Sequence, residues 1–95
     1  MNQIELTARV AELSPLRFTP AGLPALNLVL DHESEQLEAG TERQVKLSIK
    51  AVAFGTLAEQ LTRLELGRSC RCKGFLASAR THKGVIFHLQ ELNPL

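Results

Sequence analysis

Residues 53–67, AFGTLAEQLTRLELG, mark the place where the sequence changes from a strand pattern to a helix pattern. Three leucines in this stretch have i, i+4 and i+7 spacing, which places them on one side of a helix: Leu57, Leu61 and Leu64. Thr56 and Glu59 have the spacing of a capping box, so we expect Thr56 to cap the helix. Gly67 follows as a suitable stop, and the sequence therefore predicts one short helix here.

Apolar and polar residues alternate on both sides of this helix, which indicates half-buried strands. Three such stretches precede it, at residues 3–13, 23–32 and 44–52, and two follow it, at 69–79 and 85–92. The turn TPAG at residues 19–22 joins the first two strands into a hairpin. The polar, acidic residues 33–42 are expected to form a solvated loop. Gly74, in the middle of the fourth strand, predicts a bulge or a sharp bend.

The expected order is strand, strand, strand, short helix, strand, strand. This is the layout of the OB-fold, an all-β, five-stranded Greek-key barrel whose face commonly binds oligonucleotides. We therefore expect one OB-fold domain over residues 1–95, with the helix between strands 3 and 4. Another small barrel, or a meander with a helix inserted, is the alternative.

The 95-residue chain has a net charge of only +1, yet the charge is unevenly distributed. Residues 1–42 carry two basic and seven acidic side chains, a net of −5, whereas residues 43–95 carry nine basic and three acidic ones, a net of +6. A nearly neutral protein with charge-separated halves can still present a basic face.

Several classes of protein are disfavoured by what the sequence lacks. No apolar run is long enough to span a membrane and no signal peptide is present, so we expect a cytoplasmic protein without a membrane contact. Cys70 and Cys72 are expected to be small buried apolar residues rather than a disulfide or zinc ligands. His32, His82 and His88 are scattered, and no catalytic motif occurs. We expect no enzyme, no small-molecule substrate, no cofactor and no metal.

The basic residues are better organised, because many occupy outward positions of the expected strands or the turns between them. A groove lined by such cations would follow a phosphate backbone and release counterions on binding. The candidate DNA contacts are Arg17, Arg43, Lys46, Lys50, Arg71, Lys73, Arg80 and Lys83. Each of them taken singly could equally be an ordinary surface residue.

The acidic run Glu33, Glu35 and Glu38 has two interpretations. Such a run is most often a solvated face, and its functional interpretation is a contact for a basic partner protein. A protein–protein adaptor with weak residual DNA affinity is therefore the alternative to a DNA-binding protein. An RNA-binding OB domain is a more distant one.

The segments AFGTLAEQL (53–61), LGRS (66–69) and RCKGFL (71–76) resemble the bacterial single-stranded DNA-binding proteins. The segments PLRFTPAGLP (15–24) and LVLDHES (28–34) are similar to a narrower family, the PriB proteins of the primosome. EAG at residues 38–40, followed by Arg43 and Gln44, fits the same family. General single-stranded DNA-binding proteins end in a flexible acidic tail, whereas this sequence stops at Leu95 just after the last strand, which favours the accessory family.

The resemblance implies a homodimer of OB-folds that binds single-stranded DNA, acts in replication restart and bridges the PriA helicase and DnaT without catalysis. It implies that the first strand, with Ile4 and Leu6, lies near the dimer interface. It also places Arg17 at a basic DNA contact, and Arg80 and His82 in the basic last loop, where His82 replaces a lysine.

Two departures from the family pattern affect the expected affinity. Thr41 and Lys46 occupy positions where other members carry aromatic rings that stack on bases, and the last loop is shorter. Since base stacking is worth about 1–3 kcal/mol per base, we expect weak binding that depends mainly on phosphate contacts and therefore on salt.

Overall fold

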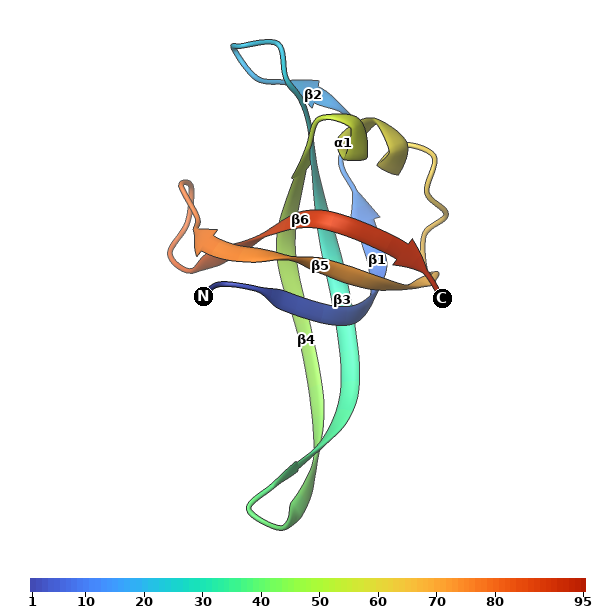
Figure 1. Cartoon of the computed structure of the whole chain (residues 1–95), viewed down its shortest axis with the longest axis vertical. Coiled ribbons are helices and arrows are strands. Elements are labelled where there is room, and N and C mark those ends of the chain that lie inside the picture. The colour runs from blue at the N-terminus through green and yellow to red at the C-terminus, as the bar shows by residue number, and fades with distance from the viewer.

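Six strands and one helix make up the computed structural model, which describes residues Met1–Leu95 (Figure 1). The elements are β1 (Ile4–Leu13), β2 (Arg17–Phe18), β3 (Pro24–Glu38), β4 (Thr41–Phe54), α1 (Thr56–Leu61), β5 (Ser69–Ser78) and β6 (Val85–Pro94). Five of the strands are the predicted ones. The additional strand, β2, has only two residues and extends the hairpin between β1 and β3.

The five long strands close into a barrel because β1 pairs with both β3 and β5. Around the barrel the order is β1, β3, β4, β6, β5 and back to β1. The seam between β4 and β6 is parallel and has only two residue pairs, Ala51 with Phe87 and Val52 with His88. This Greek-key closure, with α1 between the third and fourth long strands, confirms the predicted OB-fold.

The barrel interior is filled by alternate side chains of every long strand. The predicted inward set of β3, Leu26, Leu28 and Leu30, is at most 3% exposed. Cys70 and Cys72 are free and fully buried, as predicted. Burial raises the pKa of the Cys72 thiol to about 11, so this sulfur stays protonated and acts as a small apolar group.

The prediction of a solvated loop at residues 33–42 is wrong. β3 and β4 continue as a paired two-stranded ribbon to a tight turn at Ala39 and Gly40, and this arm projects well beyond the barrel (Figure 1). Both turn residues have positive φ, as the favoured two-residue hairpin turns require. The sequence of residues 33–42 does not predict the ribbon because it is mostly polar on both faces, so no apolar alternation marks it.

The predicted cap of the helix is also wrong. Gly55 rather than Thr56 is the N-cap residue, and no side chain caps the helix. The backbone enters α1 from β4 with a φ of 71° at Gly55, a conformation that suits glycine. The helix ends at Leu61, earlier than Gly67 suggested, although Leu57 and Leu64 still pack against the core. With six residues, α1, the one helix of the structure, is too short to cross a membrane.

Gly74 lies at a register shift between β5 and β6, which confirms the predicted bulge. A Cβ at this position would overlap with the carbonyl oxygen of His88 and would lie 3.1 Å from the ring of Phe87. Glycine therefore allows β5 to approach the backbone of β6 closely at His88. This residue of β6 also pairs with Val52 of β4.

We predict that Gly74→Ala lowers the free energy of unfolding by about 3 kcal/mol, because backbone atoms must move to accommodate the added methyl group. Ser78→Ala, an exposed position on the same strand, is the control and should change it by less than about 0.5 kcal/mol. Urea denaturation followed by circular dichroism measures both. A Gly74→Ala protein as stable as the Ser78→Ala protein would contradict the close approach of β5 and β6.

Candidate nucleic-acid interface

This fold commonly binds oligonucleotides on the outer face of its second and third long strands, here β3 and β4, and at the loops that flank them. The outer face of β6 adjoins this face at the barrel seam. The strand register places Asn27 beside Val52 and Val29 beside Lys50, and it places Val52 beside His88 across the seam. Since side chains alternate between the two faces of a strand, these residues point away from the barrel core. Val52 is nonetheless only 3% exposed although it lies outside the core cluster, so other side chains on this outer face must cover it.

A groove of about 500 Å³ runs along this face. Asn27, Val29 and Lys50 form its floor, and Ile86 of β6 lines it as well. The end of β1, which includes the carboxylate of Glu12, lines one side of the groove, and the loop between β5 and β6 contributes Thr81 and His82. Lys50 and His82, which lie on elements far apart in the sequence, thus line one groove together with apolar side chains.

Arg17 reaches the same face from the short strand β2. Its Nε donates a hydrogen bond of 2.9 Å to Oδ1 of Asn27, a residue of the groove. This bond directs the guanidinium group towards the groove, while its remaining N–H donors make no hydrogen bond within the protein. A guanidinium held in this way is suited to bind a phosphate.

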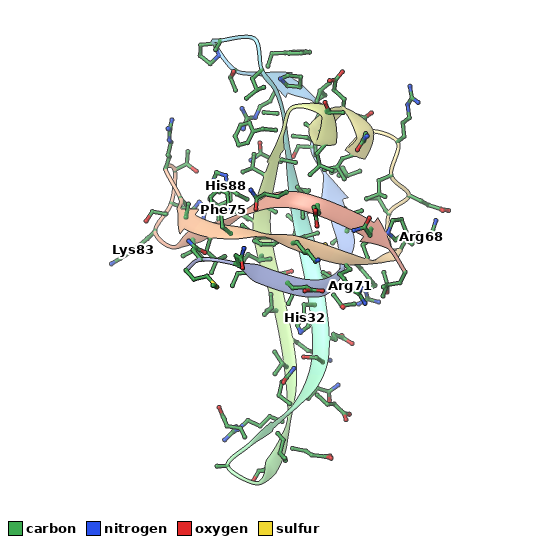
Figure 2. All side chains as sticks on the ribbon, in the orientation of Figure 1. His32, Arg68, Arg71, Phe75, Lys83 and His88 are labelled. Atoms are coloured by element: carbon green, nitrogen blue, oxygen red, sulfur yellow. The ribbon has the colours of Figure 1, made fainter.

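Three aromatic rings, which the sequence analysis did not assign to the interface, form a stack on the same outer face. His88 lies between Phe75, at a ring-centroid distance of 4.6 Å, and Phe54, at 6.0 Å. Figure 2 shows Phe75 and His88 beside each other on β5 and β6, on the side of the barrel where the loop with Lys83 lies. Phe54 is 39% exposed, so the stack forms an accessible apolar surface beside the groove.

Part of this stack could have been found from the sequence. Phe54 has the same parity as Val52 and Lys50, and Phe75 the same parity as Lys73, so alternation alone assigns both rings to the outer face. His88 lies between Phe54 and Phe75 because of how β6 pairs with its two neighbours. It is paired with Val52 of β4 and with Phe75 of β5. That register follows from barrel closure and has no local signal in the sequence.

Four of the predicted DNA contacts form ion pairs with carboxylates. The pairs are Arg43 with Glu38 (2.6 Å), Lys46 with Glu33 (3.9 Å), Arg71 with Glu5 (3.4 Å) and Lys73 with Glu91 (4.0 Å). All eight side chains are about half exposed or more, so these pairs contribute little to stability. They do place a negative charge beside each of these four cations.

These four cations also lie apart from the groove. Arg43 and Lys46 are on the arm, and Lys73 lines a separate depression between β1, β5 and β6. Arg71 and Lys83 are found at opposite ends of the β5–β6 hairpin (Figure 2). The structure therefore does not bring the nine predicted residues into one surface.

Five of the predicted contacts have no carboxylate partner, and each lines the groove, contacts a residue of the groove or is a near neighbour in sequence of such a residue. Arg17, Lys50 and His82 contact or line the groove, and Arg80 and Lys83 flank His82 in the exposed loop between β5 and β6. No carboxylate lies within ion-pair distance of any of the five. We refer to these residues, Arg17, Lys50, Arg80, His82 and Lys83, as the groove cations.

The acidic candidates Glu33, Glu35 and Glu38 all lie on the arm. Glu33 and Glu38 are held in the ion pairs described above, whereas Glu35 has none. Between them, Leu37 has 74% of its surface exposed. No group of three histidine, cysteine or carboxylate side chains gathers closely enough to hold a metal ion.

Comparison with known proteins shows what this chain is similar to in sequence. A family model described as another single-strand binding protein family matches residues 2–91. The replication restart protein PriB of Bordetella pertussis is 53% identical over 92 residues, which cover 96% of this chain and 86% of the relative.

Solved structures show the same relationship. The structure of PriB from Ralstonia solanacearum has a TM-score of 0.89 at 39% identity and covers 99% of this chain and 97% of its own. A deletion mutant of the single-stranded DNA-binding protein from Thermus aquaticus has a TM-score of 0.79 at 26% identity, over all of this chain and 50% of its own.

Proposed function

Because the chain belongs to the single-strand binding protein family, and within it to the PriB replication restart proteins, we propose that it is a non-catalytic DNA-binding protein of the replication-restart primosome. The observation that carries the proposal is the groove on the outer face of β3, β4 and β6, where unpaired cations lie beside stacked rings. Single-stranded DNA needs both features, because its phosphates are charged and its bases are exposed.

The groove cations bind the phosphates in this proposal. Arg17, held by Asn27, and Lys50, on the groove floor, take the central positions. Arg80, His82 and Lys83 approach the strand from the loop between β5 and β6. An exposed base stacks on Phe54 at the accessible end of the ring stack, so binding does not depend on charge alone.

We predict that the protein binds fluorescein-labelled oligo-dT more tightly than duplex DNA of the same length, and that its affinity falls with salt. Five phosphate contacts correspond to a slope of log K against log [salt] of about −3.5 for single-stranded DNA. Lys50→Ala and Arg17→Ala should each flatten that slope by about 0.7 to 1. Fluorescence anisotropy at four or more salt concentrations measures the slopes.

The matched control is Arg63→Ala, which removes an exposed cation next to α1, outside the groove, and should leave the slope unchanged. Absence of binding at low salt, or equal affinity for duplex DNA, would refute the proposed function. A slope flattened by Arg71→Ala and Lys73→Ala but not by Lys50→Ala would refute the choice of face and favour the β1–β5–β6 side instead.

We propose that the protein is a homodimer joined at the free edge of β1. Only Arg9 and the residues after it pair with β3, so Ile4 to Ala8 have a partner on the β5 side alone. The side chains of Ile4 and Leu6 pack against the core, which leaves the backbone of this edge as the part available to a second copy. The carbonyl oxygen of Thr7 lies on the free edge, where Nδ1 of His32 contacts it at 2.7 Å.

We predict that Glu5→Pro dissociates the dimer. Residues two apart in a strand direct their N–H and C=O groups to the same side, so the N–H of Glu5 points to the free edge as that of Thr7 does. Proline removes this donor without breaking the pairing of β1 with β5. Sedimentation should give about twice 10.5 kDa for the wild type and for the control Glu5→Ala, and about 10.5 kDa for Glu5→Pro. A monomeric wild type, or a dimeric and folded Glu5→Pro protein, would contradict the edge pairing.

We propose that the arm contacts the protein partners of the primosome, the PriA helicase and DnaT. Support comes from its acidic side chains, from the exposed Leu37 and from its two strand edges, which no other element covers. An apolar side chain within a ring of charges is a common arrangement at the centre of a protein interface.

We predict that Leu37→Ala combined with Glu35→Gln weakens capture of purified PriA at least tenfold and leaves the oligo-dT affinity unchanged. Lys50→Ala should have the opposite effects, losing DNA affinity and keeping PriA. Surface plasmon resonance with immobilised PriA and anisotropy with DNA separate the two surfaces. If the arm variant captures PriA like the wild type, the partner surface lies elsewhere.

A further inference from the structure

The tip of the β2–β3 hairpin exposes two large apolar side chains. Phe18 has 64% of its surface exposed and Leu23 has 45%. Phe18 is the most exposed of the large aromatic residues in the protein. Neither residue belongs to the core or to the groove described above.

The tip is held by hydrogen bonds even though it is a surface turn. The backbone N–H of Thr19 donates to the carbonyl of Leu23 (2.9 Å), and that of Gly22 donates to the carbonyl of Thr19 (2.8 Å). The N–H of Leu23 donates to Oγ1 of Thr19 at 3.1 Å. With a φ of 84°, Gly22 completes the reversal of the chain. Phe18 is therefore presented in an ordered setting, and little conformational entropy is lost when a ligand covers it.

Phe18 is also adjacent to the groove. It follows Arg17, whose guanidinium is bound to Asn27 on the groove floor, and it pairs with Pro24 of β3. Pro24 precedes Asn27 by three residues, which is about 10 Å along a strand. Successive side chains of a strand point to opposite faces, so the ring of Phe18 lies on the other side of the hairpin from Arg17. Because β2 is an edge strand, a DNA strand that leaves the groove past Arg17 reaches the ring of Phe18 by crossing this edge.

We propose that Phe18 is a base-stacking residue, which receives one unpaired nucleobase at the hairpin end of the groove while Arg17 holds a neighbouring phosphate. The proposal rests on the proposed DNA-binding function and adds a contact to it. An aromatic ring and a base present flat π faces to each other, and such stacking tolerates any base sequence.

The first test uses the absence of tryptophan and tyrosine from the chain. Phe18→Trp introduces a single fluorophore at the tip, and a base stacked on the indole should quench its emission as oligo-dT is added. The matched control is Leu66→Trp, an exposed position of 54% in the segment between α1 and β5, where no quenching is expected. An abasic phosphodiester of the same length should bind through the cations without quenching the tryptophan emission of either variant.

The second test measures affinity by anisotropy. Phe18→Ala and Phe18→Leu should weaken oligo-dT binding by about 5- to 100-fold, whereas Phe18→Tyr should keep the wild-type affinity. The slope against salt should not change, because no charge is removed. The variants should not differ from wild type in binding the abasic strand. Since Phe18 is mostly exposed, urea denaturation should give all of them nearly the stability of the wild type.

The outcomes separate this proposal from the function on which it rests. If the wild type does not bind oligo-dT at low salt, the proposed function fails. If the wild type binds and Phe18→Trp is not quenched, or Phe18→Leu binds like the wild type, only the stacking role of Phe18 is overturned. Loss of PriA capture by Phe18→Ala with unchanged DNA affinity would likewise overturn it, and would assign the tip to a protein partner.

Discussion

Closure of the barrel between β4 and β6 is the constraint on which the candidate site depends. The seam consists of two residue pairs, a short contact for the strands that it joins. His88 reinforces it in two ways, because its ring lies between Phe54 of β4 and Phe75 of β5 and its carbonyl lies against Gly74. Lys50 and the loop with His82 line one groove only when β4 and β6 are joined here. His88 thus contributes both to barrel closure and to the surface beside the groove.

The barrel could be predicted from the sequence because its strands each bury one face. Alternation at Leu26, Leu28 and Leu30 reflects that burial directly, and the leucines around α1 reflect the packing of the helix in the same way. The arm is different. Its strands are held by backbone pairing and by cross-strand pairs such as Lys46 with Glu33, and neither face is buried. A ribbon without a buried face has the composition of a loop, and only the three-dimensional pairing distinguishes the two.

The sequence predicts which kinds of residue face outward, but it does not predict which of the outward cations are paired with a carboxylate. Outward lysines and arginines can be assigned from alternation, but which of them meets a carboxylate depends on register. Lys46 lies opposite Glu33, whereas Lys50 lies opposite Val29, although both have the same parity on β4. Thr41 and Lys46 carry no ring at positions where the family pattern has aromatic residues, while Phe54, Phe75 and His88 form a stack elsewhere on the surface.

The unequal charge of the two halves of the sequence is largely removed by folding. Three of the four ion pairs join an acid of residues 1–42 to a cation of residues 43–95: Glu38 with Arg43, Glu33 with Lys46 and Glu5 with Arg71. A carboxylate at this distance repels a phosphate nearly as strongly as its partner attracts it. The groove cations form no such ion pair, although Glu12 also lines the groove. The candidate phosphate-binding surface is therefore the one whose cations are not held by a carboxylate. A net charge of +1 is thus compatible with a local phosphate-binding surface, and the strand register rather than the composition determines where that surface lies.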